Sequence, residues 1–96
     1  GQVTMPERLH VRISGEVQGV GFRYSTFQQA TALGLAGWVR NCIGGEVEAE
    51  FEGPHEDLER ILDWCWKGPR FARVTHVEPE WEHSEEPKYH TFTLRG

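Results

Sequence analysis

The amino-acid sequence has no apolar run long enough to span a membrane, and it contains only two cysteines in 96 residues. A membrane-spanning helix needs about 20 mostly apolar residues. Cys42 and Cys65 are too few for the disulfide framework of a small secreted domain, and their spacing fits no zinc motif. No basic segment followed by an apolar stretch opens the chain, so no signal peptide is expected. These absences predict a cytoplasmic protein with reduced thiols and without a metal site or a membrane partner.

Positive charge is also scarce, because ten Lys and Arg residues stand against fifteen Asp and Glu, a formal net charge of −5. Such a balance argues against a general binder of nucleic acids or anionic membranes. The charge is unevenly distributed, however. Residues 1–42 contain four basic and two acidic residues (+2), whereas residues 43–96 contain six and thirteen (−7). If the protein has an anion-binding site, the first part of the chain is therefore where it is expected.

The remaining composition describes one domain with a modest core, since 38% of the residues are apolar and 26% are charged. Regular alternation begins at Leu9, so residues 9–96 are predicted to form a single domain and residues 1–8 a flexible N-terminal segment. Residues 1–4 precede Met5 and are interpreted as an expression remnant. No long apolar stripe is left over, and we expect a monomer.

The hydrophobic periodicity predicts five strands and two helices. Alternating or apolar runs bounded by glycine or proline indicate the strands, at 9–14, 35–41, 46–52, 74–81 and 90–94. Apolar residues at helical spacing indicate the helices, at 22–33 and 54–67. This order is typical of an α+β, ferredoxin-like βαββαβ sandwich, with two helices on one face of a mainly antiparallel sheet and a short extra C-terminal strand.

The strand at 46–52 alternates without a slip, which predicts that its four glutamates point into water. Further along, Pro79 predicts an edge position or a bulge for the strand at 74–81. Three histidines seven residues apart fit no ligand spacing and are interpreted as solvated: His76, His83 and His90. Cys65 falls on the apolar side of its helix.

The glycine-rich stretch 15–21 joins the first strand to the first helix. A backbone that turns just before a helix directs several N–H groups at one point, where the helix dipole adds partial positive charge. Arg23 follows in the first helical turn and can bind a phosphate or carboxylate with two parallel hydrogen bonds. The stretch lacks the Lys-Ser/Thr of nucleoside-triphosphate loops and the third glycine of dinucleotide-binding loops, so neither ligand is expected.

Two segments resemble the motifs of the acylphosphatase family: 15–23, GEVQGVGFR, and 37–41, GWVRN. Together with Gly34-Leu35, Gly53-Pro54 and Gly68-Pro69, the resemblance covers residues 9–95. It implies a small ferredoxin-like hydrolase that cleaves the carboxyl–phosphate bond of acyl phosphates without a metal or other cofactor. The family's catalytic residues correspond to Arg23 and Asn41. Its phosphate-binding residues correspond to Gly15, Glu16, Val17, Gln18, Gly19 and Val20, with Arg23.

The residue chemistry agrees with that implication. An acyl phosphate has a good leaving group, so the site must mainly neutralise the phosphoryl oxygens and place a water molecule. Loop N–H groups and Arg23 can do the first. The Asn41 amide can orient water but cannot accept its proton, and a phosphate oxygen of the substrate is the predicted proton acceptor. The expected partners are therefore small acyl phosphates and inorganic phosphate.

Two alternatives remain at the level of sequence. Acylphosphatase-like domains also occur inside larger carbamoyl-transferring proteins, so the chain could be a binding or accessory module that acts on carbamoyl phosphate. RNA-recognition domains share the predicted topology and bind through the open sheet face. The glutamates predicted to cover that face would repel a phosphate backbone, and no nucleic-acid partner is expected.

Overall fold

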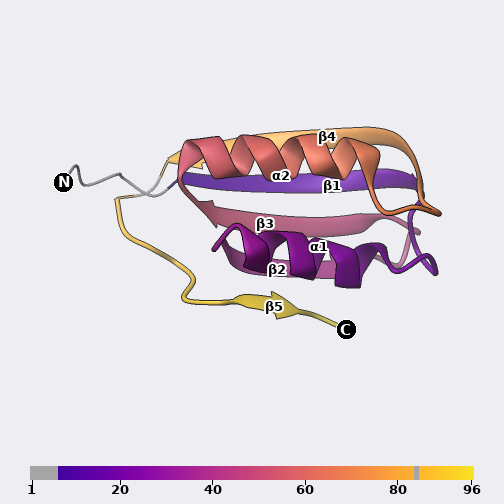
Figure 1. Ribbon diagram of the computed structural model, residues 1–96, viewed down its shortest axis with the longest axis horizontal. Coiled ribbons are helices and arrows are strands. Elements are labelled where there is room, and N and C mark those ends of the chain that lie inside the picture. The colour runs from indigo at the N-terminus through magenta and orange to yellow at the C-terminus, as the bar shows by residue number, and fades with distance from the viewer. Residues whose placement is uncertain (1–6, 84) are drawn as a thin grey trace.

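Two helices lie on one face of a five-stranded sheet in the computed structural model, which describes residues 7–83 and 85–96 (Figure 1). The elements follow one another as β1 (Glu7–Glu16), α1 (Phe22–Ala32), β2 (Ala36–Asn41), β3 (Val47–Gly53), α2 (His55–Lys67), β4 (Arg73–His83) and β5 (Phe92–Leu94). The predicted α+β, ferredoxin-like sandwich is confirmed.

The first strand begins earlier than the sequence predicted. Glu7 and Arg8, assigned to the flexible N-terminal segment, belong to β1, where they pair with Gly53 and Glu52 of β3. Arg8 is held there by ion pairs with carboxylates on both sides, which no local pattern reveals. The rest of that segment, including the interpreted remnant at 1–4, lies outside the described residues.

The strand order in the sheet is β4-β1-β3-β2-β5. All neighbours are antiparallel except β2 and β5, which run parallel. Pro79 lies in the edge strand β4, as predicted, a position in which proline is tolerated within sheets. Three connections meet at the right-hand end of Figure 1: the β1–α1 loop, the β2–β3 turn and the α2–β4 loop.

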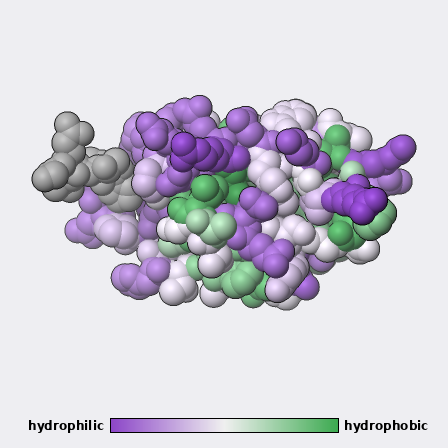
Figure 2. All heavy atoms as spheres, viewed as in Figure 1, coloured by the Kyte–Doolittle hydropathy of each residue, from purple (hydrophilic) through white to green (hydrophobic). Residues whose placement is uncertain are grey.

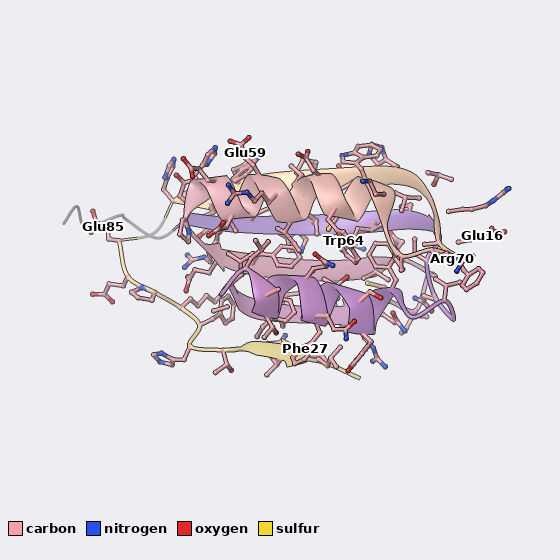
Figure 3. All side chains as sticks on the ribbon, viewed as in Figure 1. Glu16, Phe27, Glu59, Trp64, Arg70 and Glu85 are labelled. Carbon is pink, nitrogen blue, oxygen red and sulfur yellow. The ribbon has the colours of Figure 1, made fainter. Side chains whose placement is uncertain are left out.

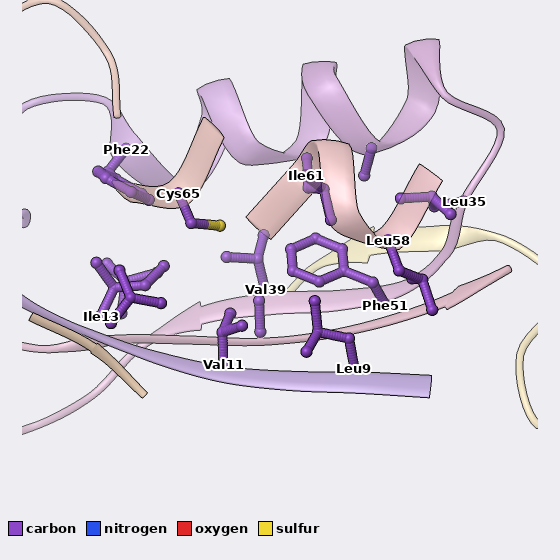
Figure 4. Packing of buried hydrophobic residues seen from close by; sticks show 14 of the residues in the cluster. Leu9, Val11, Ile13, Phe22, Leu35, Val39, Phe51, Leu58, Ile61 and Cys65 are labelled. Atoms are coloured by element: carbon purple, nitrogen blue, oxygen red, sulfur yellow. The ribbon is translucent and has the colours of Figure 1, made fainter. Parts of the chain in front are cut away.

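The core lies between the sheet and the helices (Figure 4). Alternate residues of the two central strands β1 and β3 are fully buried and face α1 and α2. The helices supply residues at helical spacing, including Phe22 and Ala30 from α1 and Leu58, Ile61 and Cys65 from α2. Cys65 is wholly buried, as expected, and burial raises the pKa of its thiol, which keeps the sulfur protonated.

The sheet side away from the helices, here called the outer face, corrects one prediction. Glu48 and Glu52 do not point into water, because only 7% and 5% of their surfaces are exposed. Antiparallel register places Arg8 of β1 opposite Glu52, and both Arg12 of β1 and Arg40 of β2 opposite Glu48. Alternation identified the face on which these carboxylates lie, but it could not show that basic side chains of neighbouring strands cover them.

Glu48 accepts hydrogen bonds or ion pairs from three basic residues of neighbouring strands. His10 Nε2 lies 2.6 Å away, Arg40 Nε 2.7 Å and Arg12 Nη2 3.5 Å. Burial opposes ionisation of this carboxyl, but the contacts with His10 and Arg40 outweigh burial and lower its pKa. The carboxylate therefore stays charged inside the network.

Glu52 forms a similar centre with the segment that precedes β5. It accepts hydrogen bonds from Arg8 Nη1 at 3.0 Å and from the backbone N–H groups of Lys88 and Tyr89 at 2.9 and 3.1 Å. Burial raises its pKa, but these donors together lower it below the usual range. The carboxylate thus ties the C-terminal segment to the sheet.

Neither helix is long and apolar enough to cross a membrane within residues 7–83 and 85–96. On the side seen in Figure 2, hydrophilic residues cover most of the surface, while hydrophobic residues show between the helices and at the right-hand end. That end is where the three connections meet.

Candidate functional site

The predicted phosphate-binding stretch divides into a strand end and a true loop. Gly15 and Glu16 belong to β1, in which a β-bulge shifts the register to β4 between Ser14 and Gly15. A side chain at Gly15 would place its Cβ 2.1 Å from the carbonyl oxygen of Arg73, and its φ of 124° disfavours other residues. This glycine therefore permits close strand contact, and the loop after β1 begins at Val17.

Two glycines turn the loop into the helix. Gly19 and Gly21 have φ of 76° and 78°, in the left-handed region that favours glycine. Gly21 is the N-cap of α1 and offers no side chain to the helix end. The first backbone N–H groups of a helix have no partner within it, so the N-terminus of α1 presents donors and partial positive charge toward the loop. This is a suitable environment for a phosphate.

Gln18 anchors the loop to the β2–β3 turn. Its side-chain Nε2 donates to the carbonyl oxygens of Cys42 at 2.7 Å and Glu46 at 2.8 Å. These bonds hold the loop beside the end of β2, where Asn41 is the last strand residue. The side chain of Gln18 therefore acts as a brace between the two predicted motifs, and its amide is occupied by backbone carbonyls.

The structure brings the two predicted catalytic residues together in one pocket of about 250 Å³. Arg23 comes from the first turn of α1 and Asn41 from the end of β2, eighteen positions apart in sequence. The pocket is lined by Val17, Gly19, Gly21, Phe22, Arg23, Tyr24 and Asn41. Val17 and Phe22 are buried and form an apolar floor.

The lining lacks some residues of the predicted site and includes others that were not predicted. Gly15, Glu16, Gln18 and Val20 are not among the lining residues. Sequence reasoning missed three residues that are: Gly21, Phe22 and Tyr24. Gly21 lies within the glycine-rich stretch and Phe22 within the quoted motif, so both were visible in the pattern. Tyr24 immediately follows Arg23, but nothing in the spacing indicates that it also lines the pocket.

Arg23 donates one hydrogen bond from Nη1 to the carbonyl oxygen of Arg95, at 2.6 Å. That acceptor lies just beyond β5, which is paired with β2. A neutral carbonyl orients the guanidinium without neutralising it. Because a guanidinium has five N–H donors, the others remain for an anion.

Arg40 precedes Asn41 in the sequence but takes no part in the pocket. Its Nε donates to Glu48 at 2.7 Å on the outer face, and this contact raises its pKa. Alternation along β2 explains this, because Arg40 and the neighbouring Asn41 lie on opposite faces of the strand. Cys42 also faces Glu48, with Sγ 4.0 Å from a carboxylate oxygen.

The outer face has two hollows slightly larger than the loop pocket, of about 310 and 280 Å³. Carboxylates line both, and the basic residues there are paired with acids. Their charge is unsuited to a phosphate, so we regard the loop pocket as the candidate site. Among the described residues, no group of three or more His, Cys, Asp or Glu side chains is placed to hold a metal ion.

Comparison with known proteins agrees with this geometry. An acylphosphatase family model matches residues 9–94. An acylphosphatase of Thermococcus kodakarensis is 53% identical over 78 residues, which are 81% of this chain and 86% of the relative. The crystal structure of acylphosphatase from Bacillus subtilis is similar with a TM-score of 0.89 and 33% identity, covering 94% of this chain and 99% of that one. Full-length HypF in its phosphate- and nucleotide-bound form is similar with a TM-score of 0.85 and 26% identity; the match covers 100% of this chain but 12% of HypF.

Proposed function

The chain belongs to the acylphosphatase family, and from that premise we propose that it hydrolyses the carboxyl–phosphate bond of small acyl phosphates, giving a carboxylate and inorganic phosphate. The observation that carries the proposal is the single pocket that joins Arg23 and Asn41 at the N-terminus of α1. The reaction needs no metal or other cofactor, because the leaving carboxylate is stable and the phosphoryl group is held by fixed donors.

Phosphate binding is assigned to the loop backbone and to Arg23. The turn at Gly19 and Gly21 directs N–H groups at the pocket, and the N-terminus of α1 adds partial positive charge. Arg23 supplies a full charge and planar donors that fit two phosphoryl oxygens. These contacts strengthen as negative charge gathers on the equatorial oxygens in the transition state.

The attacking water is assigned to Asn41, whose amide carries both a donor and an acceptor. The water oxygen forms a bond to phosphorus while the bond from phosphorus to the carboxyl oxygen breaks, and the carboxylate leaves with that electron pair. The water proton moves to a phosphoryl oxygen. No residue of the pocket lining is a carboxylic acid or a histidine, which supports this substrate-assisted route.

A second candidate is a binding or accessory role toward carbamoyl phosphate. The likeness to a small part of HypF supports it, because it shows that this fold also occurs within a much longer chain. The pocket would use the same phosphate contacts. Turnover of acyl phosphates by the isolated chain would favour the hydrolase, whereas phosphate binding without turnover would favour the accessory role. We further propose a cytoplasmic monomer without a nucleic-acid partner.

Hydrolysis of benzoyl phosphate, measured with EDTA present throughout, tests the function. The wild type should turn over, and Asn41→Ala should lower kcat by about 10²-fold or more, the usual effect of removing one preorganised polar group. Competitive inhibition by inorganic phosphate should persist in the variant, because the loop and Arg23 remain. Full turnover by Asn41→Ala would show that the water is placed by another group.

A further inference from the structure

Tyr24 lies in the pocket lining beside Arg23, yet 57% of its surface is exposed. An aromatic side chain with this much exposed surface at a polar site offers hydrophobic area that a ligand can cover. It lies in the first turn of α1, next to the helix end assigned to the phosphate. Tyr24 therefore lies in the same pocket as the proposed phosphate site, and the acyl part of a substrate is attached to that phosphate.

A row of aromatic rings from three elements fixes the position of Tyr24. Tyr24 stacks on Phe27, with ring centroids 6.2 Å apart and an interplanar angle of 25°. Phe27 contacts Phe92 of β5 at 6.2 Å, and Phe92 stacks on the fully buried Phe51 of β3 at 5.5 Å. Figure 3 shows Phe27 between α1 and β5. The row supports the exposed ring from the core outward. The side chain of Tyr24 therefore loses little conformational freedom when a ligand contacts it.

The charge of the lining indicates which acyl groups fit. Arg23 is the only charged residue of the lining, and in the proposed reaction its guanidinium binds the phosphate. An acyl group with a second carboxylate or phosphate would find no further cation there. Val17, Phe22 and Tyr24 are the apolar or aromatic side chains of the lining, and of these Tyr24 alone is exposed.

We propose that Tyr24 contacts the acyl group and that the site prefers acyl phosphates with neutral, apolar acyl groups, aromatic ones most of all. The proposal rests on the proposed function. It adds selectivity for the acyl group, which the contacts with the phosphate do not provide. Aromatic rings gain both hydrophobic burial and offset stacking against a fixed ring.

The test compares kcat/KM for benzoyl phosphate and acetyl phosphate, which share the phosphate and differ in the acyl group. Tyr24→Ala should lower the value for benzoyl phosphate by about tenfold, mainly through KM, and that for acetyl phosphate less than twofold. Tyr24→Phe should retain the wild-type ratio. Phe71→Ala is the matched control, because Phe71 is 75% exposed in the α2–β4 loop and outside the lining. Equal losses for both substrates would overturn the proposal.

Phosphonate inhibitors make the test independent of turnover. Benzylphosphonate should bind the wild type about tenfold more tightly than methylphosphonate or 4-carboxybenzylphosphonate, and Tyr24→Ala should remove that difference without changing inhibition by inorganic phosphate. Binding is read by calorimetry, and circular dichroism checks that each variant folds. If the wild type hydrolyses neither acyl phosphate, the proposed function fails while the phosphonates still decide the role of Tyr24. Equal binding of the phosphonates by the wild type would overturn the role.

Discussion

The loop pocket and the outer face both contain arginines, but they use them in opposite ways. Arg23 in the pocket is held by the neutral carbonyl of Arg95. On the outer face, Arg8 contacts Glu52 and Glu82, and Arg40 contacts Glu48. Carboxylates neutralise the second group, whereas the contact of Arg23 is with an uncharged acceptor. The net charge of −5 is therefore compatible with the proposed anion site, because local pairing decides which positive charges are available.

The two regions also differ in what supplies the polar groups. Gly19 and Gly21 line the pocket without adding side chains, so backbone N–H groups at the start of α1 are its proposed donors. The outer face is built from long charged side chains in cross-strand register. Preorganised backbone donors do not reorient when a ligand binds, which suits catalysis. Paired side chains instead hold the strands and the C-terminal segment together.

The largest effect is expected when Arg23 is removed from the pocket. Arg23→Ala should lower kcat/KM for benzoyl phosphate by about 10³-fold or more and should also abolish inhibition by inorganic phosphate. Arg40→Ala is the matched control, since Arg40 adjoins Asn41 but contacts Glu48 on the outer face. It should lower the melting temperature and leave KM within about twofold. An equal loss of activity in both variants would contradict the division between the regions.

An intermediate effect, on stability alone, is expected when the outer face loses Glu52. Glu52→Ala removes the buried partner of Arg8 and the acceptor of the Lys88 and Tyr89 N–H groups. The free energy of unfolding should fall by about 3 kcal/mol, the lower end for breaking a buried ion pair, because Arg8 keeps Glu82. Denaturant unfolding measures the change.

The control for that variant lies on the same face. Glu80→Ala removes a carboxylate whose side chain is 82% exposed and 3.9 Å from His10, so it should cost less than about 0.5 kcal/mol. Both variants should keep the wild-type kcat, because Glu52 lies at the end of β3 remote from the loop. A loss of turnover in Glu52→Ala at a temperature where it is folded would show that the regions are coupled.

The smallest effect concerns pH. A hydrogen bond with Glu7 raises the pKa of His55, and Glu59 adds to the rise. The stability from these contacts is fully present below the unfolded pKa of about 6.5 and is lost as pH rises through the higher folded value. The melting temperature should therefore fall slightly more between pH 6 and pH 9 in the wild type than in His55→Gln.

Turnover should stay level over the same range, because no histidine lines the pocket. His76→Gln is the control for stability, since among the described residues the ring of His76 contacts the uncharged ring of Trp66 and not a carboxylate. A steep rise in kcat with a midpoint near pH 6.5 would reveal a general base outside the proposed mechanism. If the melting temperature of His55→Gln falls between pH 6 and pH 9 by as much as that of the wild type, the contact with Glu7 does not contribute to the pH dependence.

Much of the site could be predicted because its determinants are local. The turn into α1 depends on Gly19 and Gly21, and Arg23 follows within one helical turn, so a short segment contains the whole proposed phosphate-binding element. Asn41 ends a strand whose alternation also places Arg40 on the other face. The ring of Tyr24 could not be placed, because its support comes from Phe27, Phe92 and Phe51 on three elements.

By itself the sequence determined the order of the elements, the face on which each alternating residue lies and the two segments that form the pocket. The order and the faces follow from local periodicity, which depends on near neighbours, whereas the two pocket segments were identified by their resemblance to the acylphosphatase motifs. The tertiary structure alone decided that Gly15 meets Arg73, that the Arg95 carbonyl orients Arg23, and that Glu48 and Glu52 are buried. Each of these contacts joins segments far apart in the chain, and no periodic pattern reports which partner covers a given face.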